Sequence, residues 1–188
     1  MAVQIGQAEP GCNDPVGLLT ACHRRIERFL KTLIVAAKRA SDRDLEKEEL
    51  EAVERSLRYF RDAAPKHTAD EEHDLFPALV GKQTDTVSTV EGLQSDHLRA
   101  NELHAQVDAL GERWLRDRRL STDDLEEFKD ATAQLDALYT VHIKLEESEV
   151  FPRAANVLDE AELEAIGRNM AARRGVKFVP KNQRVSVL

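Results

Sequence analysis

Aromatic side chains, glycines and cysteines are all scarce in this sequence. Only 5% of the 188 residues are aromatic and only eight are glycine, whereas 41% are hydrophobic and 33% are charged. Strand-forming aromatics and turn glycines are too few for a sheet-rich protein, and the balance favours long amphipathic helices. A chain of this length fits one compact domain with a real core. We therefore predict an all-α protein.

Basic stripes and long apolar runs are also missing. The formal net charge is −8, which argues against binding to a phosphate backbone. No apolar run reaches the length that a membrane span needs, and the start, MAVQIGQAEPGCNDP, lacks the basic and apolar parts of a secretory signal. The two cysteines, Cys12 and Cys22, indicate free thiols rather than a disulfide framework. We expect a cytoplasmic protein with neither a nucleic-acid nor a membrane partner; the sequence does not indicate an oligomeric state.

Apolar residues in the first half step by three and four, as one face of a helix requires. Asp14 and Pro15 are typical of a helix start, and this first helix should run to about Arg39. Ser41 or Asp42 is expected to cap a second helix. Pro65 should then begin either a kinked continuation or a separate short helix over residues 66–79. The polar stretch 81–89 is interpreted as a connection.

The second half repeats this pattern. A third helix carries in-phase apolar residues over 93–114, and a fourth follows Ser121 and extends over 125–150. Phe76-Pro77 and Phe151-Pro152 are expected to end their helices. A fifth, shorter helix is predicted over 160–173, with a mostly solvated charged face. The predicted organisation is a flexible leader (1–13), a four-helix bundle (14–152), and a short helix with an extended C-terminal tail (153–188).

An internal repeat relates the two halves of the bundle. HTADEEHDLFP begins at His67 and HIKLEESEVFP begins at His142, an offset of 75 residues, and both read His-x-x-x-Glu-Glu with Phe-Pro at the same place. His23 and His97 are related by an offset of 74 residues, and each precedes one of these segments. The chain is therefore predicted to form two similar helical hairpins.

The spacing of these histidines and glutamates has a chemical reason. Residues i and i+4 share one helix face, so each His-x-x-x-Glu pair can point at one spot, and the lone histidines lie within apolar stripes. Buried charges need a partner, and imidazole with carboxylate suits iron, zinc or manganese, with two carboxylates able to bridge two ions. The candidate metal ligands are His23, His67, Glu71, His97, His142 and Glu146.

These paired segments, each preceded by a lone helical histidine, resemble the repeat of the hemerythrin-like (HHE cation-binding) family over roughly residues 14–152. The resemblance implies an up-down four-helix bundle with two non-haem iron ions joined by an oxo or hydroxo bridge. It also implies that His23, His67, His97 and His142 are terminal ligands and that Glu71 and Glu146 bridge the ions.

One departure from the family pattern bears on function. Oxygen-carrying members place a further histidine four residues after the histidine of the third helix, where this chain has Asn101. Glu27 stands at the corresponding place in the first helix and is an alternative ligand or a surface residue. Glu147 is the alternative if Glu146 is turned away. The missing histidine argues against reversible oxygen carriage and favours sensing, or chemistry with peroxide, NO or oxygen.

Three functional hypotheses follow. The leading one is a di-iron protein that binds or reduces oxygen, peroxide or NO in sensing or detoxification, and its enzymatic form would be peroxidase-like, catalase-like or oxidase turnover. The second is iron storage, buffering or sensing without turnover. The third is a structural or interaction domain whose site is vestigial or holds zinc. The spacing of the ligands does not rank the small molecules.

Overall fold

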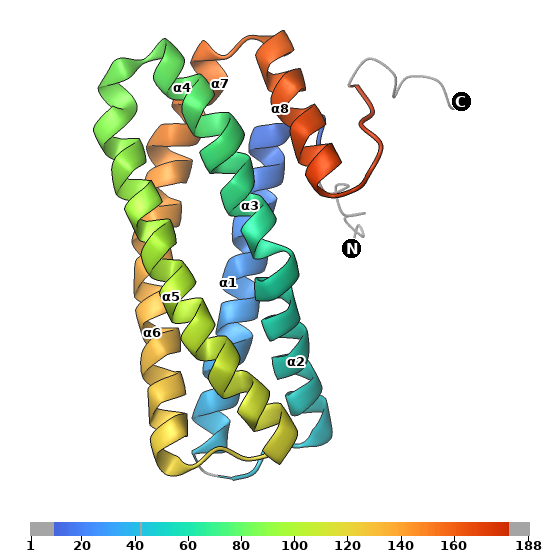
Figure 1. Cartoon of the computed structure of the whole chain (residues 1–188), viewed down its shortest axis with the longest axis vertical. Coiled ribbons are helices and arrows are strands. Elements are labelled where there is room, and N and C mark those ends of the chain that lie inside the picture. The colour runs from blue at the N-terminus through green and yellow to red at the C-terminus, as the bar shows by residue number, and fades with distance from the viewer. Residues whose placement is uncertain (1–9, 42, 181–188) are drawn as a thin grey trace, which may run out of the picture.

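The structure is a computed structural model that describes residues 10–41 and 43–180. Every regular element within these ranges is helical, as predicted, and the long helices form an up-down four-helix bundle with one short extra helix (Figure 1). No helix in the described part of the chain is both long and apolar enough to cross a membrane. Residues 1–9 of the expected leader and 181–188 of the expected tail lie outside the described residues.

The first hairpin is built from α1 and from a second arm of consecutive helices. α1 spans Pro15–Ala40, with Asp14 as its N-cap and a proline in its first turn, as expected. The second arm contains α2 (Lys47–Asp62), α3 (Ala64–Asp70), a π-helical segment (Glu71–Leu75) and α4 (Phe76–Lys82). Pro65 thus begins a separate short helix, which was one of the two expected alternatives.

The second hairpin has the same plan. After a single 3₁₀ turn (Thr84–Thr86), α5 (Val87–Asp117) runs antiparallel to α6 (Thr122–Leu145), which continues through a second π-helical segment (Glu146–Val150) into α7 (Phe151–Val157). α1 packs against α2 and α6, and α5 packs against α6 and α2, so the four arms enclose one interior (Figure 1).

Three local expectations are wrong. α2 is not capped by Ser41, which ends α1; Glu46 is its N-cap, and the side chain of Glu49 accepts from the Glu46 backbone N–H at 2.9 Å. The alternative cap, Asp42, lies outside the described residues. The connection over 81–89 is shorter than expected, because α4 reaches Lys82 and α5 begins at Val87.

The third wrong expectation concerns the Phe-Pro pairs, which do not end their helices. Each helix passes through its π-helical segment, and the proline lies in the first turn of the helix that follows. A proline inside an α-helix lacks an N–H and clashes with the carbonyl four residues earlier. The wider π turn avoids that conflict, and the Phe76 and Phe151 N–H groups bond to the carbonyls of Glu71 and Glu146, five residues back.

The fifth helix is confirmed. α8 spans Glu160–Arg173, begins with a capping box between Asp159 and Glu162, and is followed by Gly175 in the left-handed region at φ 66°. It packs on α1 and α3. The segment that precedes α1 also approaches α8 closely, because a Cβ placed on Gly167 would lie 2.1 Å from the carbonyl oxygen of Cys12.

The charged face of α8 is less solvated than expected. Arg173 and Arg174 both bind the carboxylate of Asp70, whose side chain is fully buried, and Arg173 also bonds to Asp74 at 2.8 Å. Asp70 directly precedes Glu71, so α8 holds the helix turn at which one of the candidate ligands lies.

Candidate metal centre

The two π-helical segments place the central carboxylates. Each begins at the glutamate of a His-x-x-x-Glu pair, Glu71 in one hairpin and Glu146 in the other. The extra residue in a π turn rotates the chain that follows it, and such turns often occur at functional sites. Both apolar core clusters end at this level: one extends from Ile26 toward Trp114, and the other surrounds Leu75 and Phe76. The polar layer therefore lies inside the bundle.

All six sequence-predicted residues meet in this layer. Their exposed fractions are between 0% and 4%, which is unusual for ionisable side chains. They form two overlapping groups whose ligand atoms lie within 4.8 Å of one another. His23 and His67 belong to the first group, His97 and His142 belong to the second, and Glu71 and Glu146 belong to both. This arrangement is compatible with a dinuclear metal site.

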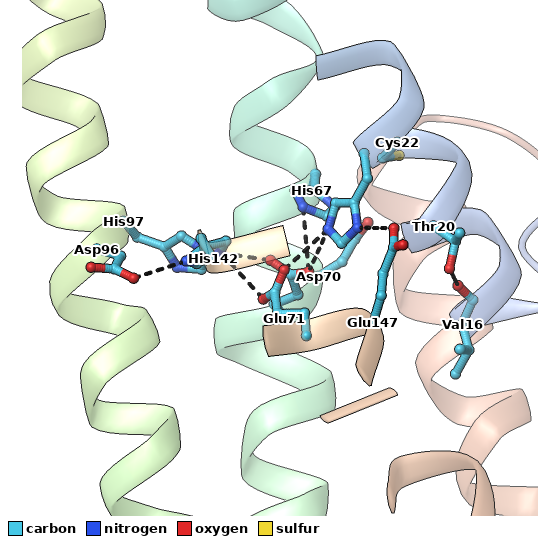
Figure 2. Close-up of polar contacts among 12 residues, drawn as sticks. Val16, Thr20, Cys22, His67, Asp70, Glu71, Asp96, His97, His142 and Glu147 are labelled. Carbon is cyan, nitrogen blue, oxygen red and sulfur yellow. Dashed lines mark hydrogen bonds and ion pairs between the residues drawn. The ribbon is translucent and has the colours of Figure 1, made fainter. Parts of the chain in front are cut away.

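The two carboxylates divide their oxygen atoms between the two groups. Glu71 places Oε1 at 3.3 Å from Nε2 of His67 and Oε2 at 3.5 Å from Nε2 of His97. Glu146 places Oε2 at 3.1 Å from Nε2 of His23 and Oε1 at 3.4 Å from Nε2 of His142. Figure 2 shows the same convergence of imidazole and carboxylate from several helices. Each carboxylate is thus placed as a bridging ligand would be.

The hydrogen bonding of these atoms is incomplete. Both oxygens of Glu71, both oxygens of Glu146, and Nε2 of His23 and His97 are buried without an aligned hydrogen bond. Buried polar atoms normally have partners, and several orphaned acceptors around one point are what a bound cation would satisfy. The donor set of neutral imidazole and carboxylate therefore fits a metal ion.

The pKa values of these residues reflect the same burial without aligned hydrogen bonds. Burial, reinforced by the charge of Glu146, raises the pKa of Glu71 well above its ordinary value. Burial opposes the charge of Glu146 as well, but contacts with His142 and His23 outweigh it and lower the pKa of that carboxyl. Burial and the neighbouring histidines lower the pKa of His67 and His97, which keeps these imidazoles neutral, as metal ligands must be.

A second set of carboxylates holds the outer nitrogens of three histidines. Nδ1 of His23 lies 2.8 Å from Glu147, and Nδ1 of His97 lies 2.8 Å from Glu72. Nδ1 of His142 lies 3.3 Å from Asp96 (Figure 2). Such contacts orient metal-binding histidines and raise their basicity. Helical periodicity does not identify these contacts, because each of them joins residues on different helices.

The fourth histidine is different. Nδ1 of His67 is buried without a hydrogen-bond partner. In the repeat, Asp96 corresponds to Cys22, a buried free thiol that accepts a bond from Arg25 at 3.2 Å. The two halves of the site are thus unequal at this one position.

The remaining candidates lie outside the cluster. Glu27 is 47% exposed and pairs with Arg24, so it is a surface residue in this structure. Glu147 contacts the outer nitrogen of His23 and not the centre of the cluster, while Glu146 points inward. Asn101 and His73 are exposed.

A helical bundle with a buried, two-group site of histidine and glutamate defines a cation-binding protein. The model of the hemerythrin HHE cation-binding domain matches residues 14–154, and the chain belongs to this family. The chain is also 32% identical over 168 residues to an uncharacterized protein of Haemophilus influenzae; the match covers 88% of this chain and 92% of that protein.

Proposed function

We propose that this protein holds two non-haem iron ions in the layer of His23, His67, Glu71, His97, His142 and Glu146, and that it uses them to bind or reduce a small oxidant. The observation that carries the proposal is the division of Glu71 and Glu146 between the two ligand groups. Two cations, each bound by both carboxylates, would compensate the charge of all four orphaned oxygens. A single cation would not.

The ligand set supports small-molecule chemistry over a closed structural site. Each ion would receive two imidazoles and one oxygen from each of two carboxylates, fewer ligands than iron usually takes. Iron bound in this way supplies open positions and electrons for oxygen, peroxide or NO. The protein's own part is to keep the imidazoles of His67 and His97 neutral, to orient three of the four imidazoles through Glu147, Glu72 and Asp96, and to exclude bulk water by burial.

The departure at Asn101 supports reduction or sensing rather than oxygen carriage. Asn101 is exposed and lies away from the cluster, so no fifth histidine makes the two metal positions unequal. Both positions then keep room for an incoming ligand. This favours a detoxifying or sensing role for the site, with oxygen, peroxide and NO as the candidate ligands.

The first experiment is elemental analysis of protein purified anaerobically from iron-replete cells. We expect about two irons per chain, with loss of iron in His67→Ala and His142→Ala. His73→Ala is the matched control, because His73 follows His67 on the same arm of the first hairpin but is exposed, and it should keep its iron. Zinc, or no metal in a fully folded protein, would contradict the proposal.

A second measurement separates chemistry from storage. Iron-loaded protein is mixed with peroxide, and both peroxide loss and the oxidation state of the iron are followed. Repeated consumption of peroxide supports an oxidant-reducing role. Slow chemistry together with a large rise in melting temperature on iron binding would instead support storage, buffering or iron sensing.

A further inference from the structure

Both tyrosines of the chain lie next to the candidate metal layer. The sequence contains two tyrosines, Tyr59 and Tyr139. Tyr139 lies on α6 one helical turn before His142, and the two ring centroids are 6.3 Å apart with the rings nearly perpendicular. An oxidisable phenol is therefore in contact with a candidate ligand of the second metal position.

The phenol of Tyr139 has a defined proton acceptor. Its oxygen lies 2.9 Å from Nε2 of His104 on α5. Burial lowers the pKa of His104 to about 4, so the imidazole is neutral at pH 7. In the tautomer that carries its proton on Nδ1, Nε2 of His104 accepts from the O–H of Tyr139 and can take its proton.

The repeat indicates that this pair is not required to build the bundle. The positions related to Tyr139 and His104 by the offsets of 75 and 74 residues are Ala64 and Leu30. Both are buried apolar residues that fill the same layer in the first hairpin. Buried polar pairs seldom stabilise a core more than apolar residues do. The pair at Tyr139 and His104 therefore calls for an explanation other than packing.

Aromatic rings continue from this pair toward the surface. Phe60 stacks on His104 with ring centroids 4.5 Å apart, Tyr59 follows Phe60 at 5.4 Å, and Phe29 stacks on Tyr59 at 4.4 Å. Phe29 is partly exposed beneath the guanidinium of Arg28. An unbroken series of ring contacts thus joins the metal layer to the outer face of α1.

We propose that Tyr139 and His104 form a proton-coupled redox pair that supplies one electron to the metal centre after peroxide has oxidised it. Hydrogen peroxide takes two electrons from the centre as its O–O bond breaks, and with two protons from solution it leaves as two waters. The phenol of Tyr139 returns one of these electrons to the metal centre while its O–H proton passes to Nε2 of His104, and a second electron from the donor in solution replaces the other. A neutral phenoxyl radical and an imidazolium remain. A one-electron donor in solution then reduces the radical along the series of rings, and the proton returns from His104. The proposal rests on the proposed function.

The test is electron paramagnetic resonance of iron-loaded, reduced protein that is mixed with an excess of hydrogen peroxide and freeze-quenched; the first peroxide only converts the ferrous ions to the ferric state, and further peroxide supplies the oxidising equivalent for the phenol. We expect an organic radical whose ring-proton splittings collapse when the tyrosines are ring-deuterated. Tyr139→Phe should lose this signal, whereas Tyr59→Phe, which removes the other phenol, should keep it. His104→Leu should decrease the radical yield and remove its dependence on D₂O, because the phenol has lost its acceptor.

Iron content and melting temperature are measured for every variant, so that misfolding is recognised; Tyr139→Phe changes one hydroxyl and leaves the ring in place. Oxidation of the iron in the wild type without a tyrosyl radical would overturn the relay and leave the proposed function intact. A full radical signal in Tyr139→Phe would also overturn it. A protein that binds no iron would overturn the proposed function, and the relay with it.

Discussion

Glu147 lies 2.8 Å from Nδ1 of His23, although 124 residues separate them and they belong to different hairpins. The mirror contact joins Glu72 of the first hairpin to His97 of the second, also at 2.8 Å. Each hairpin therefore supplies the carboxylate that orients the lone histidine of the other. Arg24 binds Glu147 from the surface and holds it in place.

This contact predicts a loss of metal affinity when Glu147 is neutralised. Glu147→Gln should weaken iron binding by roughly 10- to 100-fold, the usual effect of removing a carboxylate that orients a metal-binding histidine. Affinity is measured by competition with a chelator. Glu149→Gln is the matched control, because Glu149 lies on the same π segment but is exposed. Equal effects of the two substitutions would indicate a general charge effect and contradict the role of Glu147.

Two arginines at the C-terminal end of α8, Arg173 and its C-cap Arg174, predict a stability effect. Asp70 is fully buried, and in the described part of the chain its carboxylate is bound by Arg173 and Arg174. Removing both cations leaves a buried charge unpaired, so Arg173→Ala with Arg174→Ala should lower the free energy of unfolding by about 3 kcal/mol. Urea unfolding measures the change.

The control for this prediction is Arg168→Ala, because Arg168 is an exposed residue of α8 that pairs with Glu164 on its own helix. It should change stability by less than about 1 kcal/mol. Adding Asp70→Asn to the double variant should restore part of the loss, since it removes the unpaired charge. No recovery would mean that α8 contributes through packing alone.

Glu71 is expected to destabilise the metal-free protein and to be required for metal binding. Its carboxyl group is fully buried and lacks aligned hydrogen bonds, so Glu71→Leu should stabilise the metal-free protein, by about 1 kcal/mol or more. The same variant should lose the rise in melting temperature that iron gives the wild type. Melting curves with and without iron measure both effects. A less stable metal-free variant would show that Glu71 is needed for the fold itself.

His104 predicts a pH dependence of the metal-free protein. Burial lowers its pKa from 6.5 to about 4, so the unfolded state binds a proton more readily, and the contribution of this residue to stability is complete above pH 6.5. It is lost as the pH falls toward 4, by about 3 kcal/mol in total. Wild type and His104→Leu should therefore differ in the slope of unfolding free energy against pH across this window. His73→Ala, at an exposed position, should keep the wild-type slope.

The sequence predicts this fold well where the helical period of the apolar residues or the internal repeat determines the structure. The offset of 75 residues between His67 and His142 and the apolar stripes around His23 and His97 bring all six candidate ligands into one layer. The limits of α8 follow from Asp159 at its start and Gly175 after its end, because capping is a local property.

What the sequence does not predict depends on contacts between distant residues or on a change of helix type. Glu72 and Glu147 contact histidines of the other hairpin, and spacing within one helix does not indicate which residues of another helix they meet. The pairing of Asp70 with Arg174 spans 104 residues and has no local pattern. Phe-Pro at matched positions is the one signal for the π segments, since proline forces a local adjustment of a continuing helix.

The sharing of ligands between hairpins has a consequence for the order of events as the chain matures. Both ligand groups draw residues from both hairpins, so a nascent chain that has completed only residues up to α4 holds His23, His67 and Glu71 but lacks Glu146, the fourth member of their group. Both groups are complete only after the two hairpins have docked. A cation bound between them would then slow their separation, and the rate of metal uptake in refolding would report on docking.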